Sequence, residues 1–238
     1  WKREVGCNIR FQELFDLPFE VVEISENGLK KEPVAQILGD RAKKKWRNSA
    51  DRFLECDEVE KIKEREGYEG LFRLIEQTPV IYLKAFGPIC EVTAESYSFV
   101  KPSKNIEEKG AYLFRELTGQ CVGVHVRRTD HTEAIANSPL VLFAERMKKE
   151  LETAADTSFF VATDDKEVRR ELKELLPDAK LIFPQSDVID RDSKEGIEEA
   201  FIEMLALSKC RKILGSYNST FSLLPSYIGN IPLETVHK

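Results

Sequence analysis

At residues 122–131 the chain reads Val122-Gly123-Val124-His125-Val126-Arg127-Arg128-Thr129-Asp130-His131. Its first half is apolar and β-branched, which predicts a strand buried on both faces, as in a parallel sheet. The run ends in two arginines, so the strand would carry fixed positive charge to its carboxyl end, where open α/β sheets bind ligands. Two guanidinium groups suit a diphosphate, whose oxygens accept several hydrogen bonds at once. On spacing alone, a strand followed by a salt-bridged loop explains the stretch equally well.

Downstream of Gln120, short apolar runs alternate with helical patterns of about 10 to 15 residues. This alternation predicts a parallel, doubly wound α/β sheet. The expected strands are 121–126, 159–162, 181–183, 212–214 and 231–233, and the expected helices are 140–151, 166–176, 196–209 and 220–228. Right-handed crossovers place the carboxyl ends of all these strands at one edge of the sheet, so the loops that follow them should meet there.

The first half of the chain is less regular. It predicts short strands at 19–24 and 79–83 and helices at 41–52, 58–77 and 105–117, with a stop at Thr118-Gly119. We therefore expect two domains, an N-terminal lobe over residues 1–118 and a nucleotide-binding lobe over residues 119–238.

The composition describes an ordinary globular protein. The chain has 238 residues, 42% hydrophobic and 33% charged, with a net charge of −6. This acidic balance argues against a general nucleic-acid binder, which usually carries a basic face. No apolar run is long enough to span a bilayer, and no secretory signal is visible. Five scattered cysteines form no C-x-x-C pair, which favours reduced thiols and a cytoplasmic protein without a structural metal.

Two further loops at the expected sheet edge carry polar side chains. Thr163-Asp164-Asp165 follows the second strand, where a carboxylate could accept hydrogen bonds from a nucleotide or simply cap the next helix. The loop 215–222 includes Ser219, Thr220, Phe221 and Ser222 at a helix start, where free backbone N–H groups can hold a phosphate. An N-cap with polar filler is the alternative for this second loop.

Three segments in this half carry a family resemblance. His125-Val126-Arg127-Arg128-Thr129-Asp130, Ala162-Thr163-Asp164-Asp165 and Ser219-Thr220-Phe221-Ser222 resemble, in order and spacing, three motifs of α-1,6-fucosyltransferases and bacterial nodulation fucosyltransferases. The protein O-fucosyltransferases share these motifs more loosely. The resemblance covers the chain from about Gln120 to its end.

The resemblance implies a GT-B-like fold of two Rossmann-like lobes that moves fucose from GDP-fucose to a glycan hydroxyl, with inversion and without a metal or other cofactor. By the match, Arg127 holds the β-phosphate and stabilises the departing GDP, and Arg128 supports it. His125 and Asp164 contact the nucleotide, with Asp164 reading guanine. Ser219, Thr220, Phe221 and Ser222 line the phosphate and base pocket. Glu133, in a Thr-Glu-Ala segment, is the candidate base that accepts the acceptor's proton.

One part of the family pattern is missing. The related enzymes begin with a strand and a Gly-Gly-x-Gly-Asn-type loop, and this chain has neither. Trp1, Cys7-Asn8 and the segment 11–16 resemble the stretch located directly after that loop in the family, so we expect the first lobe to lack its initial strand.

Three alternatives stay open at this point. Asp190-Arg191-Asp192 is a D-x-D look-alike, which in metal-dependent glycosyltransferases bridges a divalent cation to the donor diphosphate. The donor could carry another nucleotide or sugar. The chain could also be a non-catalytic module that binds a sugar nucleotide or glycan.

Overall fold

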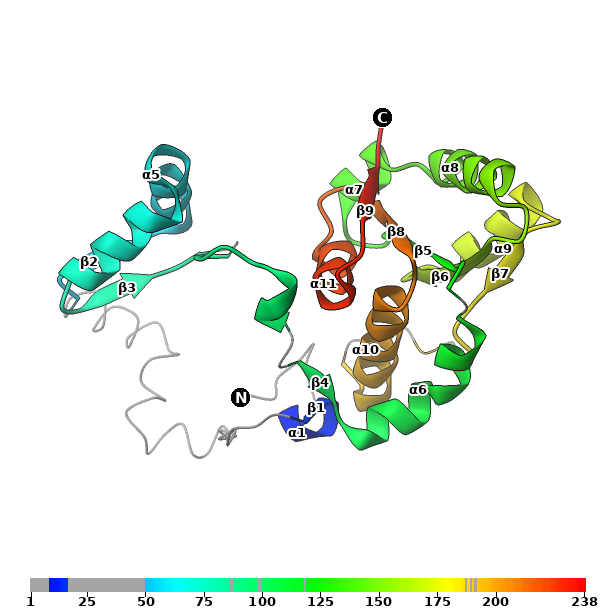
Figure 1. The fold of residues 1–238 in the computed structure, drawn as a ribbon, viewed down its shortest axis with the longest axis horizontal. Helices are drawn as coiled ribbons and strands as arrows, with labels where there is room; N and C mark the ends of the chain where they lie inside the picture. Colours follow the sequence, from blue (N-terminus) through cyan, green and yellow to red (C-terminus); the bar gives the residue numbers. More distant parts are fainter. Residues whose placement is uncertain are drawn as a thin grey trace. The chain divides into compact units, whose positions relative to one another are not determined.

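The computed structural model describes residues 9–16, 50–85, 88–97, 100–117, 119–186, 188, 190 and 192–238 (Figure 1). The chain divides into two compact units. The sheet unit consists mainly of residues 3–22 and 94–238, and the β2–α5–β3 unit consists mainly of residues 23–93. Within the sheet unit, helix α6 (Lys104–Glu116) shares an apolar core with α10 (Lys194–Ser208). The functional boundary at residues 118/119 stays a prediction.

The sheet unit is built on five parallel strands. In chain order they are β5 (Val122–Val126), β6 (Ser158–Thr163), β7 (Lys180–Ile182), β8 (Lys212–Ser216) and β9 (Leu233–Val236). Their spatial order is β7-β6-β5-β8-β9, and every neighbouring pair is parallel. The predicted α/β class and parallel sheet are therefore confirmed. The predicted last strand, 231–233, is wrong in its bounds, because the Ile231 N–H bonds back to the Ser226 carbonyl at the end of a helix.

Helices cover both faces of this sheet, which confirms the doubly wound arrangement. Side chains alternate between faces along each strand. Val122, Val124, Phe159 and Val161 pack with α8 (Leu140–Thr153) and α9 (Lys166–Leu175). Phe160 and its other-face neighbours pack with α6 and α10. A further helix, α11 (Thr220–Gly229), lies against α10 and β8.

The strand β5 approaches α10 closely. A Cβ atom on Gly123 would lie 2.9 Å from Leu207 Cδ2, closer than packed side chains normally come. Glycine at this position therefore allows α10 to settle against the centre of the sheet. His125, two residues along, lies on the same face of β5.

The β2–α5–β3 unit is a single parallel pair with its connecting helix. Strand β2 (Arg52–Leu54) pairs with β3 (Ile81–Leu83), and α5 (Cys56–Gln77) joins them with a kink at Gly67, where φ is 68°. This confirms the helix predicted at 58–77, and it places a strand within the predicted 79–83 that begins only at Ile81. The helix predicted at 41–52 is wrong at its end, because Arg52 already pairs with β3. The rest of that helix and the strand predicted at 19–24 lie outside the described residues.

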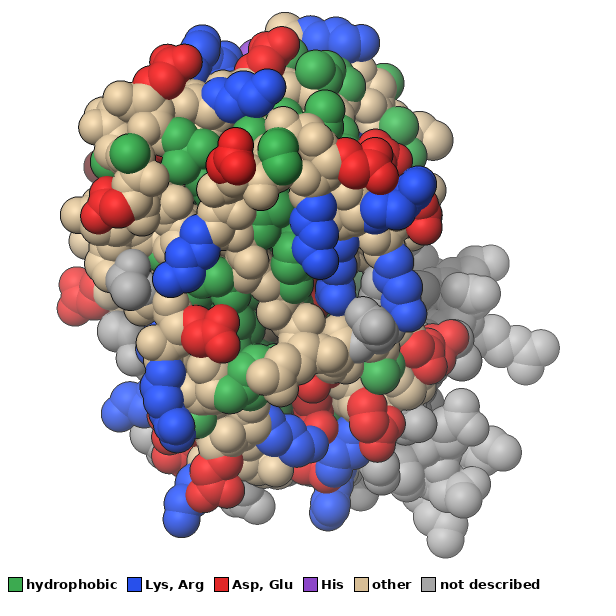
Figure 2. All heavy atoms as spheres, turned by 90° about the vertical axis from the view of Figure 1, so that its right-hand side faces the viewer, with side chains coloured by type: hydrophobic (Ala, Val, Ile, Leu, Met, Phe, Trp, Pro, Cys, Tyr) green, Lys and Arg blue, Asp and Glu red, His purple; other side chains and the backbone are tan. Residues whose placement is uncertain are grey.

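Short elements complete the described chain. They are α1 (Phe11–Leu14), β1 (Phe15–Asp16), a 3-10 helix (Ala94–Tyr97), β4 (Lys101–Pro102) and α7 (Thr132–Asn137). None of the helices among the described residues has the length and apolarity needed to cross a bilayer. On the face shown in Figure 2, acidic and basic side chains are interspersed, so this face has no broad basic surface.

Candidate functional site

A cavity of about 450 Å³ lies at the carboxyl ends of β5, β6 and β8. The chain leaves β5 for β6 on one side and later returns to β8 on the other, so this is the point where doubly wound sheets bind ligands. Residues from the strand ends, from the loops after β5, β6 and β8, from the segment before α10, and from α10 and α11 line the cavity: His125, Arg127, His131, Thr163, Asp164, Val188, Asp190, Gly196, Ile197, Ala200, Glu203, Asn218, Ser219, Thr220 and Phe221. We call the part around Arg127 and Asp164 the arginine wall, and the part formed by Gly196, Ile197, Ala200 and Glu203 the helix wall.

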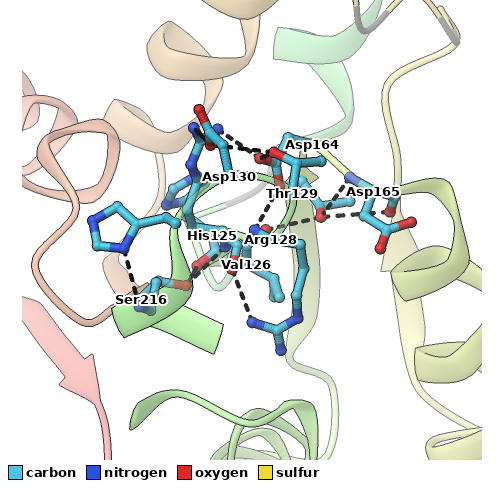
Figure 3. A network of polar contacts seen from close by, with 12 residues as sticks. His125, Val126, Arg128, Thr129, Asp130, Asp164, Asp165 and Ser216 are labelled. Atoms are coloured by element: carbon cyan, nitrogen blue, oxygen red, sulfur yellow. Dashed lines mark hydrogen bonds and ion pairs between the residues drawn. The ribbon is translucent and has the colours of Figure 1, made fainter. Parts of the chain in front are cut away.

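Asp164 organises the arginine wall. Its Oδ2 accepts hydrogen bonds from Arg127 Nη1 and from the Thr129 hydroxyl, each at 2.6 Å, and its Oδ1 accepts the Arg128 N–H at 2.7 Å (Figure 3). The other guanidinium nitrogen of Arg127, Nη2, pairs with Asp130. Arg127 is thus held in one orientation at the mouth of the cavity, with its guanidinium mostly shielded from water.

The neighbouring carboxylate performs the capping role. Asp165 accepts the Glu167 N–H at 2.9 Å and is the N-cap of α9. Because Asp165 caps the helix, Asp164 is available for the arginine wall. The two functions predicted for this loop therefore belong to consecutive residues: Asp165 caps the helix, and Asp164 lies in the arginine wall.

Arg128 differs from Arg127 in position. It is absent from the cavity lining, and its Nη1 donates to the Arg127 carbonyl at 2.9 Å. Partial burial lowers the pKa of its guanidinium, while Asp164, Asp165 and Glu171 oppose that change. Arg128 therefore supports the backbone of the loop that presents Arg127.

His125 is buried beneath the cavity. Its Nδ1 lies 2.7 Å from the Ser222 hydroxyl, and its ring centroid is 4.8 Å from that of Phe221. Burial is the main reason that the pKa of His125 falls to about 3, so the ring is neutral at physiological pH. Ser222 itself is buried and absent from the cavity lining, so its role in the structure is to hold His125.

The first turn of α11 faces the cavity. Ser219 is the N-cap residue but makes no side-chain cap bond, and Thr220 and Phe221 follow it along the lining. The first N–H groups of a helix have no acceptor within the helix, and its dipole favours negative charge there. This end of α11 can therefore hold an anion.

Two loop residues at the cavity adopt left-handed backbone conformations. Thr129 has φ of 43° and Asn218 has φ of 51°, in the loops after β5 and β8. Such conformations are unfavourable for a β-branched residue such as threonine and collect at functional sites. At Thr129 the hydrogen bond to Asp164 compensates for the strain.

Glu203 on the helix wall was not predicted from the sequence. Burial raises the pKa of its carboxyl to about 8, with Arg169 opposing and Glu199 and Asp164 adding to the change. It lines the cavity from α10, within the apolar sequence Phe201-Ile202-Glu203-Met204. A carboxylate among apolar neighbours in a buried helix is the signal that would have identified it.

The segment after the arginines brings one histidine to the cavity and leaves the glutamate outside it. His131 lines the cavity and is the N-cap of α7, where its Nδ1 accepts the Ala134 N–H at 3.0 Å. Its proton therefore sits on Nε2. Glu133 is exposed in the first turn of α7 and is absent from the cavity lining.

The two aspartates of the D-x-D look-alike contact each other. Asp190 Oδ1 accepts the Asp192 N–H at 2.9 Å, and the Asp190 carbonyl accepts the Ser193 hydroxyl. These bonds lead directly into the N-cap of α10 at Ser193. Within the described part of the chain, no three His, Cys, Asp or Glu side chains are grouped as metal ligands.

Comparison with solved structures identifies similar folds. A crystal structure of POFUT1 in complex with GDP superposes on 95% of this chain and 84% of its own chain, with a TM-score of 0.51 and 14% identity. The chain is similar in fold to POFUT1. NodZ alpha-1,6-fucosyltransferase soaked with GDP-fucose matches 72% of this chain, with 21% identity and a TM-score of 0.48, and NodZ from Bradyrhizobium matches 71%, with 21% identity and a TM-score of 0.46. This chain spans 58% of each NodZ chain. No protein-family model and no curated protein matches it.

The likeness to POFUT1 supports the fold expected from the three motifs, and the structure brings those motifs to one cavity. Arg127, Asp164, Ser219, Thr220 and Phe221 line it, and His125 reaches it from below. Arg128, Ser222 and Glu133 do not line it. Their assigned contacts with substrate stay predictions.

Proposed function

We propose that this chain is a glycosyltransferase that binds GDP-fucose in the cavity and transfers fucose to a hydroxyl of a glycan acceptor. The observation that carries this proposal is the position of Arg127. Its guanidinium is fixed by Asp164 at the cavity, and the first turn of α11 faces the same cavity. A diphosphate could bind the cation and the helix N–H groups together.

The positive charge of the arginine wall can stabilise the leaving group when the bond between fucose and GDP breaks. Separation of fucose from GDP leaves negative charge on the β-phosphate, and a cation already held in place stabilises that charge without reorganising. We assign this role to Arg127. Ser219 and Thr220 would contribute hydroxyl and backbone donors to the same diphosphate. No cofactor is required by this scheme, in which the reaction inverts the sugar carbon and needs no metal.

Recognition of the guanine base is assigned to Glu203 rather than to Asp164. Guanine offers two adjacent donors, N1–H and the N2 amino group, which match the two oxygens of a carboxylate. Both oxygens of Asp164 already accept hydrogen bonds from the arginine loop. Glu203 lines the opposite wall, where Ile197 and Ala200 provide an apolar surface for the base.

The acceptor hydroxyl must lose a proton as it attacks the sugar. We keep Glu133 as the proposed base, because α7 begins at the cavity with His131 and Glu133 lies one residue into its first turn. Glu133→Gln should then lower the transfer rate while leaving GDP affinity within about twofold, because the amide keeps the shape of the side chain.

The test combines binding with turnover. Isothermal titration with GDP, UDP and ADP should show preferential binding of GDP, and Arg127→Ala should abolish it. Release of GDP from GDP-fucose in the presence of a panel of glycans, analysed by mass spectrometry of the products, then tests transfer. Equal affinity for the three nucleotides would contradict the proposal. Tight GDP binding with no product from any glycan would favour a non-catalytic binding module.

A further inference from the structure

A buried pair of thiols lies at the end of the sheet opposite the cavity. Cys121 comes directly before β5, and Cys210 follows the C-terminal end of α10. Both side chains are buried, and the two Sγ atoms lie 3.9 Å apart in a thiol–thiol hydrogen bond. The residues are 89 positions apart in the chain, so the contact is made by the fold rather than by local sequence.

The surrounding packing holds this contact in place. The Arg211 N–H, next to Cys210, donates to the Cys121 carbonyl at 2.9 Å. A Cβ atom on Gly123 would lie 3.4 Å from the Cys210 Sγ and closer still to Leu207. These contacts join the start of β5 to the end of α10 on both sides of the thiol pair, so the two sulfur atoms are held as neighbours.

The neighbouring strands give Cys121 a polar and positive flank. Val122 pairs with Phe159, which sets Cys121 beside Ser158, and Ser158 pairs in turn with Lys180 of β7. The Ser158 hydroxyl is buried and has no hydrogen-bond partner within the described residues. A buried hydroxyl without a partner is costly, and an anionic sulfur beside it would provide that partner.

The acidity of the two thiols follows this arrangement. The hydrogen bond from Cys210, with the positive charge of Lys180, lowers the pKa of Cys121 to about 7 against the opposing effect of burial, whereas the hydrogen bond with Cys121 and burial raise the pKa of Cys210. The thiolate is the reactive form of cysteine. Cys121 is therefore the attacking sulfur of the pair, and Cys210 keeps its proton.

We propose that Cys121 and Cys210 form a reversible disulfide on exposure to hydrogen peroxide. The Cys121 thiolate attacks one peroxide oxygen, the O–O bond breaks and hydroxide leaves, which gives a sulfenic acid. Cys210 then attacks the Cys121 sulfur, the S–O bond breaks, and the proton of Cys210 leaves in water. In total, two thiols and one peroxide give one disulfide and two waters. Burial of both sulfurs restricts the oxidant to a molecule as small as peroxide.

The disulfide would tie the start of β5 to the end of α10. The sulfur atoms need to close from 3.9 Å to about 2.05 Å. A crosslink across 89 residues restricts the unfolded chain strongly, so oxidation should raise the Tm by about 5 °C or more.

The experiment uses the full chain with Cys90→Ser, because Cys90 is an exposed thiol that would react independently. The protein is treated with hydrogen peroxide, unfolded, alkylated and digested. The expected product is a Cys121–Cys210 peptide lighter by two hydrogens, formed together with the rise in Tm and reversed by dithiothreitol. Complete alkylation of both cysteines after treatment of the folded protein would overturn the proposal.

Single substitutions establish the order of the steps. In Cys210→Ser the sulfenic acid has no thiol to resolve it, so unfolding the peroxide-treated protein in the presence of dimedone, which cannot reach the buried sulfur in the folded state, should label Cys121. In Cys121→Ser dimedone should not label Cys210, and labelling there would overturn the assigned order. Ser158→Ala should slow formation of the disulfide several-fold. If a serine variant fails to fold, the peptide map of the parent protein still decides the proposal.

Discussion

The two walls of the cavity differ in the state of the charged groups that they present to a ligand. On the arginine wall, Asp164 accepts three hydrogen bonds. Each terminal guanidinium nitrogen of Arg127 has a carboxylate partner, Asp164 at Nη1 and Asp130 at Nη2. On the helix wall, Glu203 is desolvated, and the pKa of its carboxyl is raised to about 8. The charges of the arginine wall are paired within the protein. The Glu203 carboxyl on the helix wall instead keeps a proton that it can lose when a ligand binds.

This difference separates two tasks in one cavity. A wall whose charges are already oriented stabilises charge that develops during a reaction. A carboxyl that ionises only when hydrogen-bond donors of a base face it instead selects bases that carry such donors. We therefore expect substitutions on the arginine wall to affect diphosphate binding and those on the helix wall to affect the choice of base.

The largest effect is expected from Arg127→Ala. Loss of a charged, bidentate donor should lower GDP affinity by 100-fold or more, about 3 kcal/mol. Titration calorimetry measures the change. Arg128→Lys is the matched control, because a lysine can still donate to the Arg127 carbonyl, and GDP affinity should stay within about threefold. Near-normal GDP binding by Arg127→Ala would show that the arginine wall does not bind phosphate.

Glu203→Gln should lower GDP affinity by about tenfold or more, because the amide replaces one acceptor with a donor that faces guanine's own donors. In the unmodified protein the carboxyl is protonated below pH 8 and must ionise to accept both guanine donors. GDP affinity should therefore rise as the pH increases from 6.5 to 8, by up to tenfold per pH unit, and should be flat over this range in Glu203→Gln.

Thermal unfolding provides the control for this substitution. A carboxyl whose pKa is raised in the folded state makes the folded protein less stable as the pH rises from the ordinary carboxyl pKa to the raised value, and the loss levels off above that value. Glu203→Gln removes this cost, so its Tm at pH 8 should be at or above that of the unmodified protein. A fall in both Tm and affinity would mean that Glu203 only supports the structure.

Asp164→Asn should lower GDP affinity by about tenfold, roughly 1.4 kcal/mol, because Arg127 loses its main anchor and Thr129 loses a partner in its left-handed conformation. Asp165→Asn is the matched control, since asparagine caps a helix as well as aspartate does. Its GDP affinity and Tm should change little. If the two substitutions lowered GDP affinity equally, Asp164 would have no role in positioning Arg127 beyond that of a helix cap such as Asp165.

The smallest effect is expected at His131. Asparagine preserves an N-cap while it removes the imidazole from the cavity, so His131→Asn should lower GDP affinity by about threefold at unchanged Tm. Alanine removes both functions, and the Tm of His131→Ala should fall by about 2 to 4 °C in addition. If His131→Asn binds GDP as the unmodified protein does, the ring has no role in the cavity.

Regular patterns in the sequence predicted the sheet and the edge at which the cavity lies. The apolar run that ends at Arg127 and the alternation of strands and helices were sufficient for this. The partners of Asp164 could not be predicted, because they depend on the left-handed conformation of Thr129 in a tight loop. The motif match assigned Arg127 and Arg128 different roles, but the contact of Arg128 with the Arg127 carbonyl could not be predicted from the sequence.

The helix wall was missed for a different reason. A glutamate in a helix is ordinarily solvent-facing, and the apolar residues beside Glu203 are a local sign of burial that does not show what the carboxyl faces. Its surroundings depend on the close approach of α10 to β5, where Leu207 of the same helix packs on Gly123, which is far away in the chain. Tertiary packing, rather than local pattern, determines this part of the site.

The long sequence separations within the site have a consequence for how the protein folds. His125 meets Ser222 across 97 positions, the Arg127 N–H meets Ser216 across 89, and Arg127 meets Asp164 across 37. Contacts of this range form late, because the entropy of closing long loops must be overcome first. During synthesis, an arginine-bearing strand therefore exists well before it has a binding site. The proposed nucleotide binding would then depend on the completed sheet, and a bound nucleotide would protect that whole sheet from opening rather than a single loop.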